Sequence, residues 1–164
     1  DLWINIARDS LVRTIEAVDC LILNDEELEL LTEKPNFVSA AREVLTWGPS
    51  AVIAKQGKYG AALFTKDGYF ALPAFPVEDV VDPTGAGDTF AGGLVGYVAA
   101  HPEAPVNHDL LVRAMAYGSA LASFNVEAFG TERVVDLAPV EVTGRVGDLQ
   151  QMTTFAHQPI PLRG

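Results

Sequence analysis

A short turn of small residues limits the ways in which this chain can fold. Residues 83–88, Pro-Thr-Gly-Ala-Gly-Asp, precede a long apolar stretch that predicts a helix ending near Ala100. Small side chains at the start of a helix leave the backbone N–H groups accessible, and the helix dipole adds roughly half a positive charge at that end. The turn therefore predicts an anion site formed by the backbone of Gly85, Ala86 and Gly87.

Apolar segments and helical patterns alternate along the rest of the chain. Residues 19–24 are typical of a buried strand, and the acids at 25–27 indicate that a helix starts there. Asp67-Gly68 predicts a hairpin turn. The other expected elements are helices at 37–47, 109–124 and 139–151 and strands at 51–54, 61–65 and 69–74. This pattern predicts a three-layer α/β fold with a mostly parallel sheet and one antiparallel hairpin, in a single domain over 1–164 with a loose tail at 158–164.

Charge and composition exclude several classes of partner. A formal net charge of -11 argues against binding to nucleic-acid backbones, which requires clustered Lys and Arg. No segment reaches the ~20 apolar residues of a membrane span, and residues 1–5 do not resemble a signal peptide. The single cysteine, Cys20, lies in an apolar run, so we expect a buried thiol and a cytoplasmic protein.

Asp88 is the candidate catalytic residue. It follows the small residues directly and falls in the first turn of the expected helix. Phosphoryl transfer to an alcohol needs a carboxylate that orients the hydroxyl and accepts its proton. An acid in a first helical turn can also do no more than complement the helix dipole. The glycines around Asp88 favour the catalytic interpretation.

The run at residues 82–93, Asp-Pro-Thr-Gly-Ala-Gly-Asp-Thr-Phe-Ala-Gly-Gly, resembles the C-terminal signature of the PfkB carbohydrate kinases, which include ribokinase, fructokinase and adenosine kinase. The resemblance extends over residues 15–136 and corresponds to the second half of that family's ribokinase-like fold. It implies ATP and Mg²⁺ as cofactors and a sugar or nucleoside as substrate. By the same resemblance, Gly85, Ala86 and Gly87 form the anion hole and Asp88 is the base.

Two further segments match the family in order and spacing. Asn24-Asp25-Glu26-Glu27 resembles an Asn-x-x-Glu motif, which implies that Asn24 and Glu27 help to place magnesium and phosphates. The same residue types are common helix caps. Lys55, Gly57 and Gly60 fall where the family carries a nucleotide-binding turn. The family usually has Thr or Ser where Lys55 stands, and a lysine there either meets a phosphate or stays solvated.

Asp82 and Thr84 match positions that hold a monovalent cation, such as K⁺, in some members of the family. Asp82 ahead of Pro83 is equally typical of a side-chain-capped turn. The helix at 109–124 and the loop to Gly130 are expected to border the adenine, but no motif singles out contact residues there.

Two other nucleotide-binding folds do not fit. A dinucleotide-binding Gly-x-Gly-x-x-Gly/Ala motif needs Gly or Ala where Phe90 stands, and no Walker motif occurs in the chain. A module that binds a nucleotide or acts as a scaffold, without an acceptor site, remains the alternative to an enzyme. Because the resemblance covers half of the fold, we expect negligible kinase activity from this chain alone. We also expect an exposed sheet edge and apolar face that bind the missing N-terminal half or a second copy.

Overall fold

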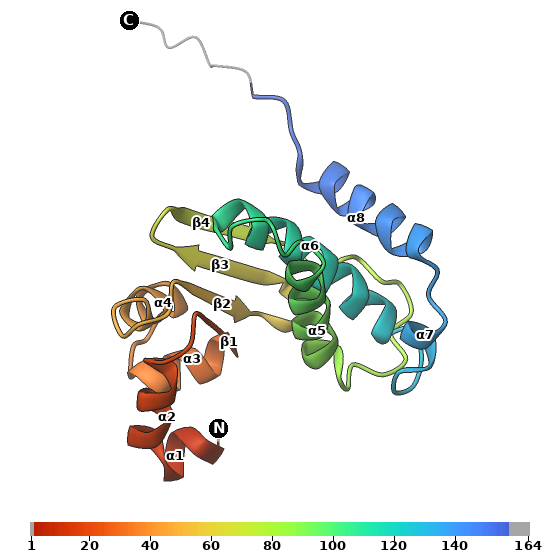
Figure 1. Cartoon of the computed structure of the whole chain (residues 1–164). Coiled ribbons are helices and arrows are strands. Elements are labelled where there is room, and N and C mark those ends of the chain that lie inside the picture. Colours follow the sequence, from red (N-terminus) through yellow and green to blue (C-terminus); the bar gives the residue numbers. More distant parts are fainter. Residues whose placement is uncertain (1, 158–164) are drawn as a thin grey trace, which may run out of the picture.

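The computed structural model describes residues 2–157, which contain a four-stranded sheet with helices on both faces (Figure 1). The strands are β1 (Cys20–Asn24), β2 (Ala51–Lys55), β3 (Ala61–Thr65) and β4 (Gly68–Leu72), in the spatial order β1-β2-β3-β4. The expected strands are confirmed to within two residues at each end, and the α/β class is confirmed. The expected tail at 158–164 lies outside the described residues.

The expectation of a mostly parallel sheet is wrong for these strands. β1 pairs in parallel with β2, whereas the β2–β3 and β3–β4 pairs are both antiparallel. The reason is the connection between β2 and β3, which is a single 3₁₀ turn, η1 (Gly57–Tyr59), with one flanking residue on each side. A parallel crossover needs a dozen residues or more. This connection is too short for one.

Alternation along β2 divides the core between the two faces of the sheet. Val52 and Ala54 contact the helices on one face, and Ala51 and Ile53 contact those on the other; all four side chains are buried. Four N-terminal helices belong to the first face: α1 (Leu2–Ile6), α2 (Arg8–Ile15), α3 (Asp25–Thr32) and α4 (Phe37–Val44). The sequence interpretation made no prediction for α1 and α2.

The opposite face is covered by α5 (Ala86–Ala99) and α6 (His108–Asn125), which pack closely against each other (Figure 1). Gly93 and Gly118 lie at their crossing, where a Cβ on Gly118 would come within 2.6 Å of the Phe90 carbonyl oxygen. Phe90 and Leu94 of α5 and Met115 of α6 complete the core beneath the sheet. The positions of both helices agree with the sequence expectation.

The chain ends in α7 (Glu132–Val135) and α8 (Pro139–Thr153), and α8 packs against α6 with Leu149 fully buried. Cys20 is only half-buried, because it lies on β1, the open edge of the sheet. Burial nevertheless raises the pKa of its thiol to about 11, with the nearby Asp19 charge adding to the effect. Over residues 2–157 we find no helix that has both the length and the apolar character needed to span a bilayer.

Candidate functional site

A cavity of about 580 Å³ lies where β1 and β2 end beside the start of α5; we call it the strand-end cavity. Six of the predicted site residues line it and come from three separate parts of the chain. They are Asn24, Lys55, Gly57, Gly60, Ala86 and Gly87. The carboxyl ends of neighbouring parallel strands open to one edge of a sheet, which is where such folds place their ligands. Gly85, Glu27, Asp82, Thr84 and Asp88 lie outside this lining.

Asn125 holds the glycine turn in place, and the sequence interpretation did not identify it. Gly85 has a φ of +80°, the left-handed conformation that glycine adopts without strain. Asn125, at the end of α6 and 1% exposed, accepts a hydrogen bond from the Thr89 hydroxyl and donates one to the Thr84 carbonyl oxygen, at 2.8 and 2.9 Å. A buried asparagine at the end of an apolar helix is the signal that could have identified it.

The start of α5 offers backbone donors to the cavity side. No side chain caps this helix, and the Ala86 N–H donates to the Pro83 carbonyl oxygen over 3.3 Å. Among the described residues, the N–H groups of Gly85, Gly87 and Asp88 have no hydrogen-bond acceptor. The available donors are therefore shifted from the expected set, because Ala86 is used within the turn.

Lys55 reaches across the cavity to this helix start. A Cβ on Gly87 would lie 2.7 Å from the Lys55 Nζ atom, so the ammonium group rests against the Gly87 backbone. None of the ion pairs described in residues 2–157 includes Lys55. A positive charge therefore faces the positive end of a helix dipole, which is unfavourable without an anion nearby. Of the two expected roles for Lys55, this position favours contact with a phosphate.

Glycines shape the turn between β2 and β3. Gly57 has a φ of +53°, and a Cβ on Gly60 would lie 2.0 Å from the Leu72 carbonyl oxygen. The Gln56 N–H closes the turn by donating to the Gly60 carbonyl oxygen at 2.7 Å. These two glycines therefore bring the backbone close to β4 and form one wall of the cavity.

Asn24 and Glu27 form a reciprocal capping box at the start of α3. The Glu27 N–H donates to Asn24 Oδ1 at 2.6 Å, and the Asn24 N–H donates to Glu27 Oε2 at 3.2 Å. Asn24 lines the cavity, and amide and carboxylate oxygens are the ligand type that Mg²⁺ prefers. Within residues 2–157 there is no cluster of three His, Cys, Asp or Glu side chains that could hold a metal. The pair thus fits a hydrated Mg²⁺ reached through water, rather than an all-protein cage.

Asp82 adopts the side-chain-capped turn that was the alternative to a cation site. Its Oδ1 atom accepts the Thr84 N–H at 2.9 Å. Hydrogen bonds from the Thr84 backbone and hydroxyl, and a further one from the Gly130 backbone, hold the pKa of Asp82 below its usual value. A carboxylate that is ionised at neutral pH in this turn is compatible with a nearby cation but does not require one.

Asp88 is exposed at the rim of the site, in the first turn of α5. Its side chain is therefore not enclosed in the core, which is what a base that meets an incoming hydroxyl requires. The residue before it, Gly87, lines the cavity, whereas Asp88 is not among the lining residues. On the described residues alone, the space beside Asp88 opens to solvent.

Much of the lining of the strand-end cavity is apolar. We call the part from the loop between β4 and α5 and from the end of α6 its apolar end: Phe75, Pro76, Val77, Val80, Ala122 and Val126. Two serines of α6 also line it. The Ser123 hydroxyl donates to the Ala120 carbonyl oxygen, whereas the hydroxyl of Ser119, a residue that is 7% exposed, has no hydrogen-bond partner among the described residues. No sequence pattern identified these residues, because they meet only through the fold.

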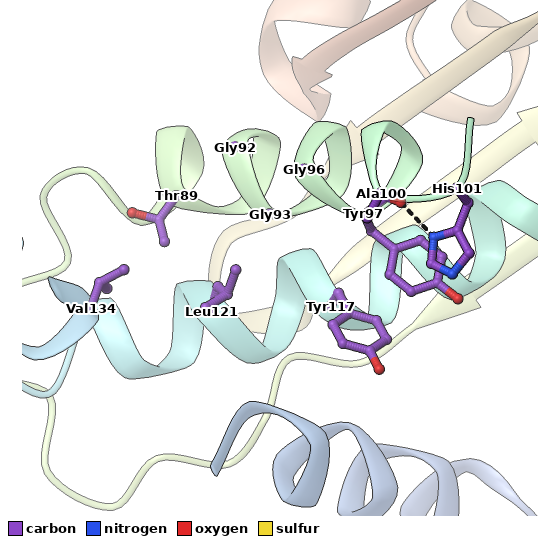
Figure 2. Close-up of a pocket in the computed structure, with 10 residues that line it drawn as sticks. All are labelled: Thr89, Gly92, Gly93, Gly96, Tyr97, Ala100, His101, Tyr117, Leu121 and Val134. Carbon is purple, nitrogen blue, oxygen red and sulfur yellow. Dashed lines mark hydrogen bonds between the residues drawn. The ribbon is translucent and has the colours of Figure 1, made fainter. Parts of the chain in front are cut away.

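A second hollow of about 560 Å³ runs between α5 and α6 on their outer side; we call it the α5–α6 groove (Figure 2). Glycines of α5 form its floor, and a Cβ on Gly92 or Gly96 would meet nothing within 4 Å. At one end Tyr97 stacks on Tyr117 and His101, with ring centroids 4.5 and 4.3 Å apart. The His101 ring also hydrogen-bonds the Tyr97 carbonyl oxygen (Figure 2).

Comparison with known proteins gives the family of this chain. The family model of the pfkB family carbohydrate kinases matches residues 1–137, and the chain belongs to that family. A cytidine kinase of Thermococcus kodakarensis is 37% identical over 99 residues, 58% of this chain and 35% of its own length. The crystal structure of aminoimidazole riboside kinase from Salmonella enterica, complexed with aminoimidazole riboside and an ATP analog, is 28% identical, with a TM-score of 0.74 over 87% of this chain and 46% of its own.

A putative ribokinase II of E. coli, in complex with ATP and Mg²⁺, is 29% identical, with a TM-score of 0.64 over 88% of this chain and 42% of its own. The chain thus spans between about a third and a half of the length of these three relatives. The relatives are kinases of sugars and nucleosides. They support a ribokinase-like fold and a kinase family for this chain.

Proposed function

We propose that residues 1–164 form, as a single domain, the C-terminal nucleotide-binding half of a three-layer ribokinase-like fold. The whole protein then transfers the γ-phosphoryl group of ATP to a hydroxyl of a sugar or nucleoside. One observation carries the proposal: the Lys55 ammonium and the uncapped start of α5 converge on one cavity. An anionic phosphate between them offsets two positive potentials that otherwise repel each other.

The reaction follows from the placement of the residues around the start of α5. The acceptor oxygen bonds to the γ-phosphorus while the bond from phosphorus to the ADP oxygen breaks, and Asp88 takes the hydroxyl proton. Lys55 and the N–H groups of Gly85 and Gly87 face the charge that builds on the transferring group. Magnesium bound with ATP neutralises phosphate charge, and Asn24 and Glu27 are the residues that would hold its water shell.

The turn at Asp82 and Thr84 is the candidate for a monovalent cation. The lowered pKa of Asp82 keeps its carboxylate charged at neutral pH, so the turn carries the formal charge that such an ion needs. Replacing Na⁺ by K⁺ in the assay tests this assignment, since a cation site raises turnover with one ion and not the other.

The acceptor site and the rest of the fold come from outside this chain. The β1 edge has no further strand beside it among the described residues, and α5 exposes mainly Gly, Ala and Val. A helix that is apolar on all sides is normally covered. We propose that the remaining half of the protein adds a strand to β1 and packs a helix in the α5–α6 groove; a second copy of the chain would occupy the same surfaces less completely.

The direct test is a panel of sugars and nucleosides offered to the full-length protein, with ATP consumption and product mass as readouts. We expect one class of acceptor to be phosphorylated. Lys55→Gln should weaken ATP binding about tenfold, the usual size of a lost charged contact. Lys66→Gln, on the exposed turn between β3 and β4, is the control and should change nothing. ATP binding without turnover on any acceptor would favour the non-catalytic module instead.

A further inference from the structure

Helix α8 lies beyond residues 1–137, the part that matches the kinase family, and yet its Arg145 reaches the wall of the strand-end cavity. The guanidinium carbon lies 3.4 Å from the centre of the Phe124 ring and 4.6 Å from that of Phe75. Only 16% of the Arg145 side chain is exposed. Phe75 lines the cavity, so one cation connects α8 to the loop that forms the apolar end.

Two guanidinium nitrogens of Arg145 also have polar partners. Its Nη1 atom donates to the Ser123 hydroxyl at 3.0 Å, and Nη2 pairs with Glu127 Oε1 at 2.8 Å. Ser123 in turn donates its own proton to the Ala120 carbonyl oxygen at 2.6 Å. The planar fork of arginine allows all these contacts at once, which a lysine ammonium does not.

The loop that Arg145 contacts has little other support. Residues 73–85 contain no helix or strand, and their hydrogen bonds to the end of α6 are made by the last part of the loop. The Val81 and Asp82 N–H groups donate to the Val126 carbonyl oxygen, and Asn125 donates to the Thr84 carbonyl oxygen. Phe75 itself is held by ring contact with Arg145. Contacts between a cation and an aromatic ring strengthen when they are shielded from water, as this one is.

We infer that Arg145 is a positioning residue for the base end of the bound nucleotide. It fixes Phe75 and Ser123, two lining residues of the cavity, by contact with one guanidinium group, whereas it has no contact with Lys55 or Gly87. The inference rests on the proposed function, and it gives α8 a part in ligand selection. The affinity for a ligand that consists of phosphates alone should not depend on Arg145, whereas the affinity for a nucleotide should.

The test compares ATP with inorganic tripolyphosphate, by calorimetry on the chain and on the full-length protein. In Arg145→Gln we expect ATP affinity to fall at least about fivefold, as the loss of about 1 kcal/mol of contacts implies, with tripolyphosphate affinity within about twofold of the original. Arg145→Lys should recover part of the loss. Arg113→Gln, an exposed arginine on α6, is the matched control and should bind both ligands normally.

The two levels of the proposal fail in different ways. If the unaltered protein binds neither ligand, the proposed function fails. If it binds both and Arg145→Gln binds ATP normally, or loses both ligands equally, the role of Arg145 is overturned. Should Arg145→Gln fail to fold by circular dichroism, Phe75→Leu takes its place, because it removes the ring from the cavity wall; the same selective loss of ATP affinity supports the inference, and its absence overturns it.

Discussion

The strand-end cavity and the α5–α6 groove have nearly the same volume, about 580 and 560 Å³, and both border α5. They differ in the polar groups of their linings. The cavity collects Lys55, uncapped N–H groups and the capping pair at Asn24, whereas the groove presents glycines, alanine and stacked aromatic rings. The comparison teaches that size does not identify a ligand site. A ligand site is identified by the direction of its backbone donors and by the placement of its charges. Small residues alone indicate a surface that packs against protein.

The largest effect should come from Asp88, at the rim of the cavity. In the whole enzyme, Asp88→Asn should lower turnover by at least ~10² and leave ATP affinity nearly unchanged, because the amide cannot accept the hydroxyl proton. Steady-state kinetics and ATP titration measure the two quantities separately. Asp109→Asn, in the first turn of α6, removes an acid from an equivalent helix position and should have no effect on turnover. Near-normal turnover in Asp88→Asn would reduce its role to complementing the dipole.

A smaller effect should follow from one added methyl group in the cavity. Gly87→Ala places a Cβ 2.7 Å from Lys55 Nζ, so the flexible ammonium must move away from the start of α5. We expect ATP affinity to fall roughly tenfold, with the free energy of unfolding hardly changed, since only the end of a side chain yields. Unchanged ATP affinity would show that Lys55 does not contact a phosphate of ATP at this position.

On the groove side, the crossing of α5 and α6 should respond in stability and not in ligand affinity. Gly118→Ala brings a Cβ within 2.6 Å of the Phe90 carbonyl oxygen, where backbone has to shift. Overpacking of this kind should lower the free energy of unfolding by about 1–3 kcal/mol in urea titrations. Gly144→Ala on α8, where a Cβ meets nothing within 4 Å, is the control. A stabilised Gly118→Ala variant would contradict the close helix crossing.

The smallest effect tests whether another part of the full-length protein packs against the α5–α6 groove. Gly92→Ala should stabilise the chain by itself by about 0.5–1 kcal/mol, because the alanine favours the helix and its Cβ contacts nothing. In the full-length protein, Gly92→Ala should not raise the free energy of unfolding if a helix lies in the groove. Equal stabilisation of the chain and of the full-length protein, measured by urea unfolding, would show that no helix covers the groove.

Sequence patterns predicted the elements of the fold better than their pairing. The apolar run at 19–24, the Asp67-Gly68 turn and the helix around 109–124 are local signals, and β1, the β3–β4 hairpin and α6 confirm them. The direction of β3 relative to β2 depends on the length of the connection at Gly57–Tyr59, and a count of that connection would have corrected the parallel expectation.

The candidate site divides in the same way. The small residues at 85–87 and the capping pair Asn24 and Glu27 stand in contiguous motifs, so their type and spacing suggested a role, which remains a prediction. Arg145, Phe75 and Ser123 are distant in sequence, and the contacts of the Arg145 guanidinium bring them together in the fold. Their role depends on contacts across three segments, and no local pattern encodes such contacts.

The open edge at β1 determines where residues from outside this chain can reach the strand-end cavity. β1 runs parallel to β2, so a further strand added in parallel beside it would also end at the level of Asn24. The residues that follow such a strand would emerge next to the strand-end cavity and to the rim where Asp88 stands. Assembly and acceptor recognition would then be one event: whatever completes the sheet also supplies the neighbour with which the nucleotide reacts.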